Sequence, residues 1–303
     1  MKFYIVTPSF RSLTWLPRCV RSVADQANEW IEIHHHVQDG GSEDGTVQWL
    51  ESWSSKVRDV PGYRFSFSSE RDGGMYDAIN RAWDLLPEDA DVTAHLNSDE
   101  QYLPGALQQV AQMFELRRKS DILLGTYIVV DRQNNYVCHR RPVMPRACLS
   151  WLNCACITNS SFYRASFFRQ KQPRFDTSWR NIGDLVFFHQ LAEEKVSFST
   201  IPDVVTSAFV CTGENLAWIA SAIEERARWE SEVPRALVIL NGLIYRWVNL
   251  SRIAVDFFCT APREYLIYDA DEEIRRHHSI THPTPLWNAS SRNASRSAGG
   301  TIS

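Results

Sequence analysis

The chain has 303 residues, of which 44% are hydrophobic and 22% charged, a composition typical of a soluble globular protein with a substantial core. Its 32 basic and 36 acidic residues give a net charge of −4, which gives no global indication of nucleic acid as a partner. The apolar run at residues 3–6 is too short for a signal peptide, and no run of about 18 apolar residues predicts a membrane span. Seven cysteines lack zinc-like spacing, with Cys154 and Cys156 in a C-x-C, and are interpreted as reduced thiols of a cytosolic protein.

The first half of the chain alternates predicted strands and helices. Apolar or alternating runs predict strands at residues 2–7, 30–37, 63–68 and 91–96. Helical spacing of apolar residues predicts helices at residues 13–27, 47–54, 75–86 and 104–118. Four strand-loop-helix units in succession favour an α/β fold, with a mostly parallel central sheet flanked by helices and joined by right-handed crossovers.

The pattern changes from residue 121 onward. Short strand-like runs without intervening helices predict that the sheet becomes partly antiparallel, at residues 122–124, 127–130 and 136–139. Residues 214–258 predict two or three helices with a break near Pro234, and residues 278–303, rich in Ser, Thr, Asn and Pro, predict a disordered tail. We therefore expect an α/β domain at 1–212, a C-terminal helical region at 213–277 and the tail at 278–303.

Each predicted strand of the first half ends in a polar loop. The four loops are Pro8–Arg11, Asp39–Thr46, Glu70–Gly74 and Asn97–Tyr102. Ligands bind outside the carboxyl ends of parallel strands, so these loops together predict a groove long enough for a nucleotide and an attached group. In the last loop, Asp99 and Glu100 form an adjacent carboxylate pair, which suits a divalent cation that also grips phosphate oxygens. A solvated acidic turn without a ligand is the alternative.

Several polar side chains also have purely structural interpretations. Asp39 can cap the helix that follows its loop, and Asp77 and Asn80 can be surface residues of their helix, where a carboxylate in the first turn favours the helix dipole. Arg71 can be a solvated surface residue. Residues 34–36 are three histidines, but side chains alternate across a strand, so they do not converge on a metal.

Three of the loop sequences resemble motifs of the family 2 glycosyltransferases. Residues 38–46, QDGGSEDGT, resemble D-G-G-S-x-D-G-T, and residues 69–80, SERDGGMYDAIN, resemble S-E-x-D-x-G-x-Y-D-A-x-N. Residues 96–100, LNSDE, are similar to L-N-S-D-D, the family's local form of the D-x-D metal motif. The resemblance covers residues 3–212 and implies the GT-A fold of nucleotide-diphospho-sugar transferases.

The resemblance also implies roles for individual residues. Pro8 would line the base pocket, Asp39 would accept a hydrogen bond from uracil or a similar base with Arg71 beside it, and Asp72 would lie near the ribose or the diphosphate. The implied nucleotide-sugar site comprises Pro8, Ser9, Arg11, Asp39, Arg71, Asp72, Asn80, Asn97 and Ser98.

A divalent metal, Mn²⁺ or Mg²⁺, is the cofactor that the resemblance implies, with Asp99 as its ligand. The family often has aspartates where this chain has Asn97 and Glu100. Asn97 can offer a carbonyl oxygen or bond to ribose, but it brings no charge, so the metal would depend mainly on Asp99.

Transfer of a sugar to a hydroxyl also needs a base that accepts the hydroxyl proton. Residues 181–188 look like the family segment that carries this base, and Asp184 falls on the matching position. Gly183 stands where the family has Glu or Ala, and Val186 where it often has Asp. Asp184 could instead only cap its helix, and Asp176 is the second candidate for the base.

Three further segments receive predictions. Residues 158–163 resemble the family's acceptor-side strand, with Asn159 and Ser160 at the positions expected to contact the acceptor. Residues 212–214 resemble the glycine-rich end of the domain that closes over the diphosphate. Residues 235–258 predict an apolar helix with arginines, which either lies on a membrane surface or packs on the catalytic domain or on a second copy in a homodimer.

The sequence therefore predicts an inverting glycosyltransferase that uses a nucleotide-diphosphate sugar, most simply a uridine one. The family suggests a glycan or lipid-linked acceptor in surface polysaccharide biosynthesis, and a cytoplasmic location that can include the inner face of the membrane. Two alternatives stay open. One is a sugar nucleotidyltransferase, although residues 8–12 lack the glycines and lysine of a triphosphate-gripping loop. The other is a nucleotide-sugar-binding scaffold subunit with a decayed site.

Overall fold

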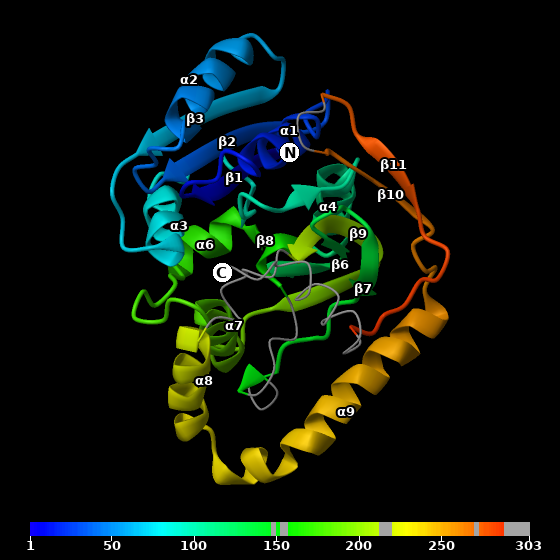
Figure 1. Ribbon diagram of the computed structural model, residues 1–303. Coiled ribbons are helices and arrows are strands. Elements are labelled where there is room, and N and C mark those ends of the chain that lie inside the picture. The colour runs from blue at the N-terminus through cyan, green and yellow to red at the C-terminus, as the bar shows by residue number, and fades with distance from the viewer. Residues whose placement is uncertain (147–149, 152–156, 212–219, 270–272, 288–303) are drawn as a thin grey trace, which may run out of the picture.

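The computed structural model describes residues 1–146, 150–151, 157–211, 220–269 and 273–287. Its centre is a mixed sheet with the strand order β3-β2-β1-β4-β8-β6-β9-β5, and β7 pairs with β6 (Figure 1). The four strands of the first half pair in parallel, at Lys2–Ser9 (β1), Glu32–Asp39 (β2), Tyr63–Ser69 (β3) and Val92–His95 (β4). The predicted parallel half of the sheet is confirmed.

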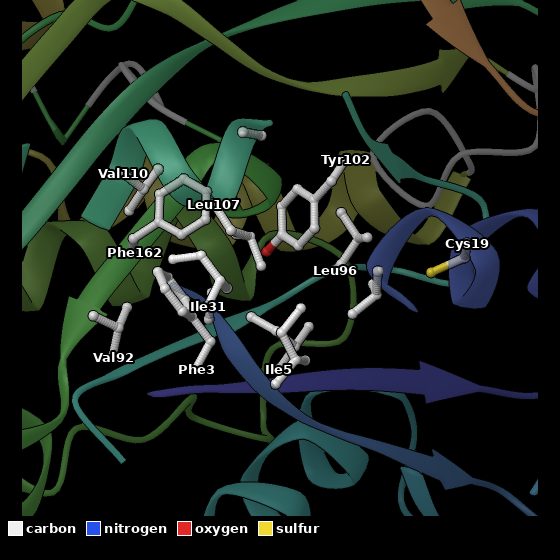
Figure 2. Close-up of a cluster of buried hydrophobic side chains, with 14 of the residues drawn as sticks. Phe3, Ile5, Cys19, Ile31, Val92, Leu96, Tyr102, Leu107, Val110 and Phe162 are labelled. Carbon is white, nitrogen blue, oxygen red and sulfur yellow. The ribbon is translucent and has the colours of Figure 1, made fainter. Parts of the chain in front are cut away.

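Helices cover both faces of this parallel half. Their bounds are Leu16–Ala24 (α1), Thr46–Lys56 (α2), Met75–Trp83 (α3) and Ala106–Leu116 (α4). Side chains alternate along β1, so Phe3 and Ile5 join one core with α1, α2 and α4 (Figure 2). Tyr4 and Val6 join a second core with α3 on the other face. Burial of both faces explains why β1 is a continuous apolar run.

The second half of the sheet is mixed in direction. Its strands are Gln101–Tyr102 (β5), Ile122–Asp131 (β6), Tyr136–Arg140 (β7), Ser161–Arg164 (β8) and Phe198–Cys211 (β9). β8 runs antiparallel to β4 and β6, whereas β6 and β9 are parallel. The predicted change of direction is confirmed, but β6 is one long strand where the sequence predicts two short ones, at residues 122–124 and 127–130. The register shifts between Gly125 and Tyr127, and these residues interrupt the apolar pattern without ending the strand.

Helices of the second half extend the fold. They comprise Ala165–Lys171 (α6), Gly183–Glu193 (α7), Ala220–Glu232 (α8) and Arg235–Phe258 (α9), with a single 3₁₀ turn at Thr158–Ser160 (η1). α6 and α7 pack with α3 on one face of the sheet. Pro234 separates α8 from α9, as predicted. No helix in the described ranges is both long and apolar enough to cross a membrane.

The C-terminal segment returns to the α/β domain. Glu264–Ile267 (β10) and Arg276–Ser279 (β11) form an antiparallel ribbon that the sequence pattern did not predict. Farther on, Thr284 accepts a hydrogen bond from His139 N at 3.0 Å. The prediction of a disordered tail from residue 278 is therefore wrong for residues 278–287, because backbone pairing and side-chain packing hold them. Residues 288–303 lie outside the described residues.

Candidate active site

A cavity of about 1430 Å³ lies at the carboxyl ends of the parallel strands. This volume exceeds the range of about 300–1000 Å³ that is usual for one small ligand. The predicted site residues that line it are Pro8, Ser9, Arg11, Arg71, Asp72, Asn97, Ser98, Asp99 and Asp184. These residues come from three of the four loops and from the first turn of α7, so the fold brings them together from distant parts of the sequence.

Asp39 anchors the loops rather than lining the cavity. Its buried carboxylate accepts hydrogen bonds from the N–H of Gly41 at 3.1 Å, from Ser42 N and Oγ at 2.8 and 2.7 Å, and from Ser69 Oγ at 2.7 Å. Ser42 Oγ in turn accepts a hydrogen bond from Arg11 N at 2.7 Å. These bonds join the first three loops, so Asp39 holds the loops in position; the contact with a base that the sequence predicts stays a prediction.

The third loop carries Asp72 into the cavity. Its carboxylate accepts a hydrogen bond from Gly74 N at 2.9 Å and lies against Gly40, where an added Cβ would come within 2.9 Å of Asp72 Oδ2. Only glycine fits at position 40 without displacing this carboxylate. Burial raises the pKa of Asp72, and the hydrogen bond from Gly74 N opposes the rise.

Both carboxylates of the predicted pair in the fourth loop line the cavity, but they differ in burial and in partners. Asp99 lines the cavity, and burial raises its pKa to about 6. Glu100 is fully buried, and its carboxylate accepts a hydrogen bond from Asn97 N at 2.9 Å across the turn. Burial and the nearby Asp99 raise the pKa of Glu100 well above its usual value. Ser98 joins this turn to the first loop by donating to Ser12 Oγ at 3.0 Å.

Hard oxygen donors gather at this turn. Besides the Asp99 carboxylate, Asn97 Oδ1 is buried and makes no hydrogen bond within the described part of the chain. Over the same part, no group of three or more His, Cys, Asp or Glu side chains could hold a metal by itself. This donor set fits Mg²⁺ or Mn²⁺ bound together with phosphate oxygens, since such ions use few protein carboxylates. It does not fit a cation cage built from protein alone.

The three adjacent histidines are structural, as predicted. His34 and His36 face one side of β2, where each contacts Ser66 Oγ, at 2.8 and 2.9 Å. His35 faces the other side and contacts Thr7 Oγ1 at 2.9 Å. Burial lowers the pKa of His35 to about 3, so the ring is neutral at physiological pH.

Asp184 enters the cavity from the first turn of α7. Its backbone N–H donates to the Tyr76 hydroxyl at 3.2 Å, which ties α7 to the start of α3. An added Cβ at Gly183 would lie 2.6 Å from the Tyr76 ring. The glycine that departs from the family pattern is thus required by this close aromatic contact. Burial raises the pKa of Asp184, and Leu185 N and the Arg226 guanidinium oppose the rise.

Glu225 of α8 fixes the segment that leads into α7. Its carboxylate accepts hydrogen bonds from three consecutive backbone N–H groups, those of Arg180, Asn181 and Ile182, at 2.7, 2.8 and 3.2 Å. A carboxylate at a helix N-terminus also interacts favourably with the helix dipole. Sequence reasoning missed Glu225 because it lies 41 positions after Asp184 in a polar helix, beyond the resemblance.

Other predicted residues lie away from the cavity surface. The Asn80 amide is bonded to the backbone of Phe175, as donor at 2.8 Å and acceptor at 3.0 Å. Asn159 and Ser160 are buried in η1, while their neighbours Ile157 and Thr158 line the cavity. Asn80, Asn159 and Ser160 therefore do not line the cavity, and the direct ligand contacts predicted for them stay predictions. Residues 212–214 lie outside the described residues.

The cavity also has lining residues that the sequence did not identify. They include Tyr76 from α3, Arg132 from the β6–β7 turn, Arg180, Phe209 from β9 and Trp287 from the C-terminal segment. The Phe209 and Trp287 rings meet edge to face with centroids 6.1 Å apart. Their place in the cavity depends on strand pairing and on the return of the C-terminal segment, which no local sequence pattern reports. Tyr76 had a signal, since it lies within one of the family motifs.

A mixed sheet whose parallel strands end at a cavity lined by carboxylates is the architecture of GT-A transferases, and the predicted fold class is confirmed. A family model for glycosyl transferase family 2 matches residues 4–195. The chain belongs to this family, which confirms the resemblance seen in its motifs.

Curated relatives match parts of the chain. An uncharacterized glycosyltransferase of Mycobacterium tuberculosis is 40% identical over 77 residues, which cover 25% of this chain and 26% of the relative. A PGL/p-HBAD biosynthesis glycosyltransferase of Mycobacterium bovis is 29% identical over 135 residues, 44% of this chain and 49% of the relative. The matched regions thus span between a quarter and a half of these relatives' length.

Solved structures share the fold at low sequence identity. Residues 1–349 of S. aureus TarS in complex with UDP-GlcNAc match with a TM-score of 0.59 and 18% identity, over 76% of this chain and 64% of that one. A mannosyltransferase from Pyrobaculum calidifontis, in complex with GDP-Man and Mn²⁺, matches with a TM-score of 0.53 and 14% identity, over 84% of this chain and 74% of that one. These similarities concern the fold.

Proposed function

We propose that the protein is an inverting glycosyltransferase that transfers a sugar from a UDP-sugar to an acceptor hydroxyl. The observation that carries this proposal is that Asp72, Asp99 and Asp184, from three distant segments, line one cavity. The cavity is large enough for a donor and part of an acceptor. The uridine donor is inferred from the motifs and from TarS, whose structure contains UDP-GlcNAc.

In the proposed reaction, the Asp184 carboxylate accepts the proton of the acceptor hydroxyl. The acceptor oxygen forms a bond to the anomeric carbon, and the bond from that carbon to the diphosphate oxygen breaks. Its electron pair leaves with the nucleoside diphosphate. The raised pKa makes Asp184 a stronger base than an exposed aspartate, which favours proton transfer. A single displacement with one base and no protein nucleophile inverts the configuration at the anomeric carbon.

We propose that Asp99, with the Asn97 carbonyl, holds a divalent metal together with the donor diphosphate. When bound, Mg²⁺ or Mn²⁺ neutralises charge on the leaving group. Burial disfavours the ionised form of Asp99 in the absence of a cation, and a bound cation favours it. Metal affinity should therefore be weak without nucleotide and stronger with it. The mannosyltransferase structure that contains Mn²⁺ supports this cofactor.

We further propose that the acceptor is a glycan or a lipid-linked glycan of surface polysaccharide biosynthesis, and that the protein works at the cytoplasmic face of the membrane. The name of the M. bovis relative, a PGL/p-HBAD biosynthesis glycosyltransferase, supports an acceptor in cell-surface assembly. The predicted domain division at residues 212 and 277 stays a prediction, as does a homodimer.

The direct test measures release of nucleoside diphosphate from a panel of UDP-sugars, with GDP-mannose as the non-uridine donor and with Mg²⁺ or Mn²⁺ present. We expect turnover with a UDP-sugar and a loss of at least about a hundredfold in Asp184→Asn and in Asp99→Ala. Asp176→Asn is the matched control, because that carboxylate bonds Ser178 N at 2.9 Å outside the cavity. Near-full activity of Asp184→Asn would refute the base assignment, and donor binding without any turnover would favour the decayed-site alternative.

A further inference from the structure

The longest helix, α9, leaves most of its apolar side chains uncovered. Figure 1 shows it along the outer edge of the molecule, between α8 and the β10–β11 ribbon. Of its 24 residues, only Val248 and Arg252 are buried. The exposed apolar side chains include Ile239, Leu243, Leu250 and Phe257, which are 82%, 63%, 63% and 84% exposed. Spacings of four and seven residues place these four on one face of the helix, away from Val248 and Arg252.

Positive charge borders this apolar face. Arg235 and Arg246 are exposed and lie eleven residues apart, about three turns, on the same side of the helix. The acidic residue of α9, Asp256, is already bound to Arg141 at 2.8 Å and to His139 at 2.6 Å. The uncovered face therefore combines hydrocarbon and aromatic side chains with cations, and it offers no carboxylate to pair with them.

A second cavity, of about 380 Å³, lies beside this face, between α9, the end of β7 and the C-terminal segment. Two guanidinium groups, those of Arg140 and Arg246, line it together with Leu250, Ile253 and Trp287. Arg140 donates one hydrogen bond to Pro285 O at 3.2 Å, but neither arginine forms an ion pair with a carboxylate of the described chain. Two arginines that converge in an apolar cavity suit a phosphate group attached to a hydrocarbon chain.

We propose that this cavity and the apolar face of α9 form a binding site for an anionic phospholipid at a bilayer surface. Arg140 and Arg246 would bind the lipid phosphate, while Ile239, Leu243 and Phe257 enter the boundary between head groups and acyl chains. Charge complementarity selects this occupant over a second copy of the chain, since two α9 faces in contact would bring arginines together without a carboxylate between them.

The site would also orient the enzyme. Trp287 lines both the cavity that contains Arg140 and Arg246 and the large cavity at the carboxyl ends of the parallel strands. A lipid held by Arg140 and Arg246 would therefore lie beside the part of the large cavity that Trp287 lines. Membrane binding itself does not depend on sugar transfer, so the two proposals can fail separately.

The test is sedimentation of the full chain with vesicles of phosphatidylcholine alone or of phosphatidylcholine mixed with phosphatidylglycerol. We expect binding to the mixed vesicles and little binding to the neutral ones. Arg246→Gln, alone and combined with Arg140→Gln, should weaken binding, the double variant by about tenfold or more. Arg58→Gln combined with Arg117→Gln makes the same change in net charge at exposed sites elsewhere and should bind as the wild type does.

A second pair of variants tests how much the exposed apolar side chains of α9 contribute to vesicle binding. Leu243→Ser combined with Phe257→Ser should abolish sedimentation, whereas Ile223→Ser on α8, which removes an apolar side chain that is 69% exposed, should not. Asp184→Asn should bind vesicles normally, which separates this proposal from the catalytic one. The lipid site would be refuted if the wild type does not bind vesicles, or if both double arginine variants lose the same amount of binding. It would also be refuted if the protein forms a dimer in solution that Leu243→Ser with Phe257→Ser dissociates, while vesicles are not bound.

Discussion

Asp184 combines a position in the cavity with an environment that disfavours its charge. Burial raises its pKa, so the folded protein binds its proton more tightly than the unfolded chain does. Such a group stabilises the fold fully below its unfolded pKa, and this contribution is lost as pH rises through the higher folded pKa. A functional carboxylate at this position therefore reduces stability at the pH where it acts as a base.

Asp184→Asn should therefore change stability and activity in opposite directions. The melting temperature of the variant, relative to wild type, should increase as pH is raised from about 4 to about 8, because the amide has no proton to lose. Thermal melts across this pH range, on protein without donor, measure the difference.

Asp176→Asn provides a control of opposite sign. A backbone hydrogen bond from Ser178 lowers the pKa of Asp176, so its ionised form stabilises the fold as pH rises. Because this pKa lies below the unfolded value, the melting temperature of that variant should fall relative to wild type as pH rises to about 4 and stay nearly constant from about 4 to about 8. If Asp184→Asn behaves in the same way as Asp176→Asn, the Asp184 carboxylate is not held in the environment described above.

At the scale of elements, α7 can present Asp184 only because two other helices hold its start. The Tyr76 ring of α3 packs against Gly183, and its hydroxyl accepts a hydrogen bond from the Asp184 N–H. The Glu225 carboxylate of α8 accepts hydrogen bonds from the three N–H groups of residues 180–182. These three N–H groups precede the first residue of α7 and have no partner within the helix, so an outside carboxylate determines how the helix start is placed.

Glu225→Gln should therefore lower kcat by about tenfold to a hundredfold, because small displacements of a catalytic group are costly, while KM for the donor changes less. The amide keeps the size of the side chain but replaces one acceptor oxygen with a donor that faces N–H groups. Glu224→Gln, at the exposed neighbouring position, is the matched control. Steady-state kinetics with varied donor measure both constants. Equal changes in kcat for the two variants, or a change confined to KM, would contradict the positioning role.

The parallel half of the fold was predictable because each of its elements carries its own signal. β1 is a buried apolar run, and the turns after β2, β3 and β4 contain motifs whose order fixes one edge of the sheet. The second half gave weaker signals. Gly125 interrupts the pattern of β6 although a close contact with Thr206 of the neighbouring strand requires a glycine there. Pairing across strands decides such positions, and one sequence does not display it.

The same limit applies to the candidate site. Asp72, Asp99 and Asp184 were found because motifs contain them, and the structure places all three on one cavity. The motifs do not distinguish a residue that contacts ligand from one that shapes a loop, and they gave no sign of the hydrogen bonds that Asp39 and Asn80 make to neighbouring segments. Glu225 and Trp287 lie in regions where nothing local indicates that they approach the site.

For the molecule as a whole, the C-terminal ribbon is bound to the start of the chain through Arg275. Its guanidinium makes a bidentate pair with Asp25, at 2.6 and 2.8 Å, and donates to the carbonyl oxygens of Tyr102 and Leu266 at 2.8 and 3.0 Å. The arginine side chain is 8% exposed and that of Asp25 32%. The Arg275 guanidinium thereby joins the ribbon to α1 and β5, although the residues involved span most of the sequence.

Arg275→Met should consequently destabilise the whole protein rather than detach the ribbon alone. Loss of a buried pair leaves Asp25 and two carbonyl groups without their donor, and we expect a decrease of about 3 kcal/mol in the free energy of unfolding, the low end for buried pairs because Asp25 is partly solvated. Urea unfolding, followed by circular dichroism and by tryptophan fluorescence, measures the midpoint and tests whether the two signals change together. Arg276→Met is the adjacent control, since its pair with Asp269 at 2.9 Å involves a side chain that is 57% exposed. An equal loss in both variants, or separate transitions for the two signals in Arg275→Met, would show that this cation does not join the C-terminal segment to the α/β domain.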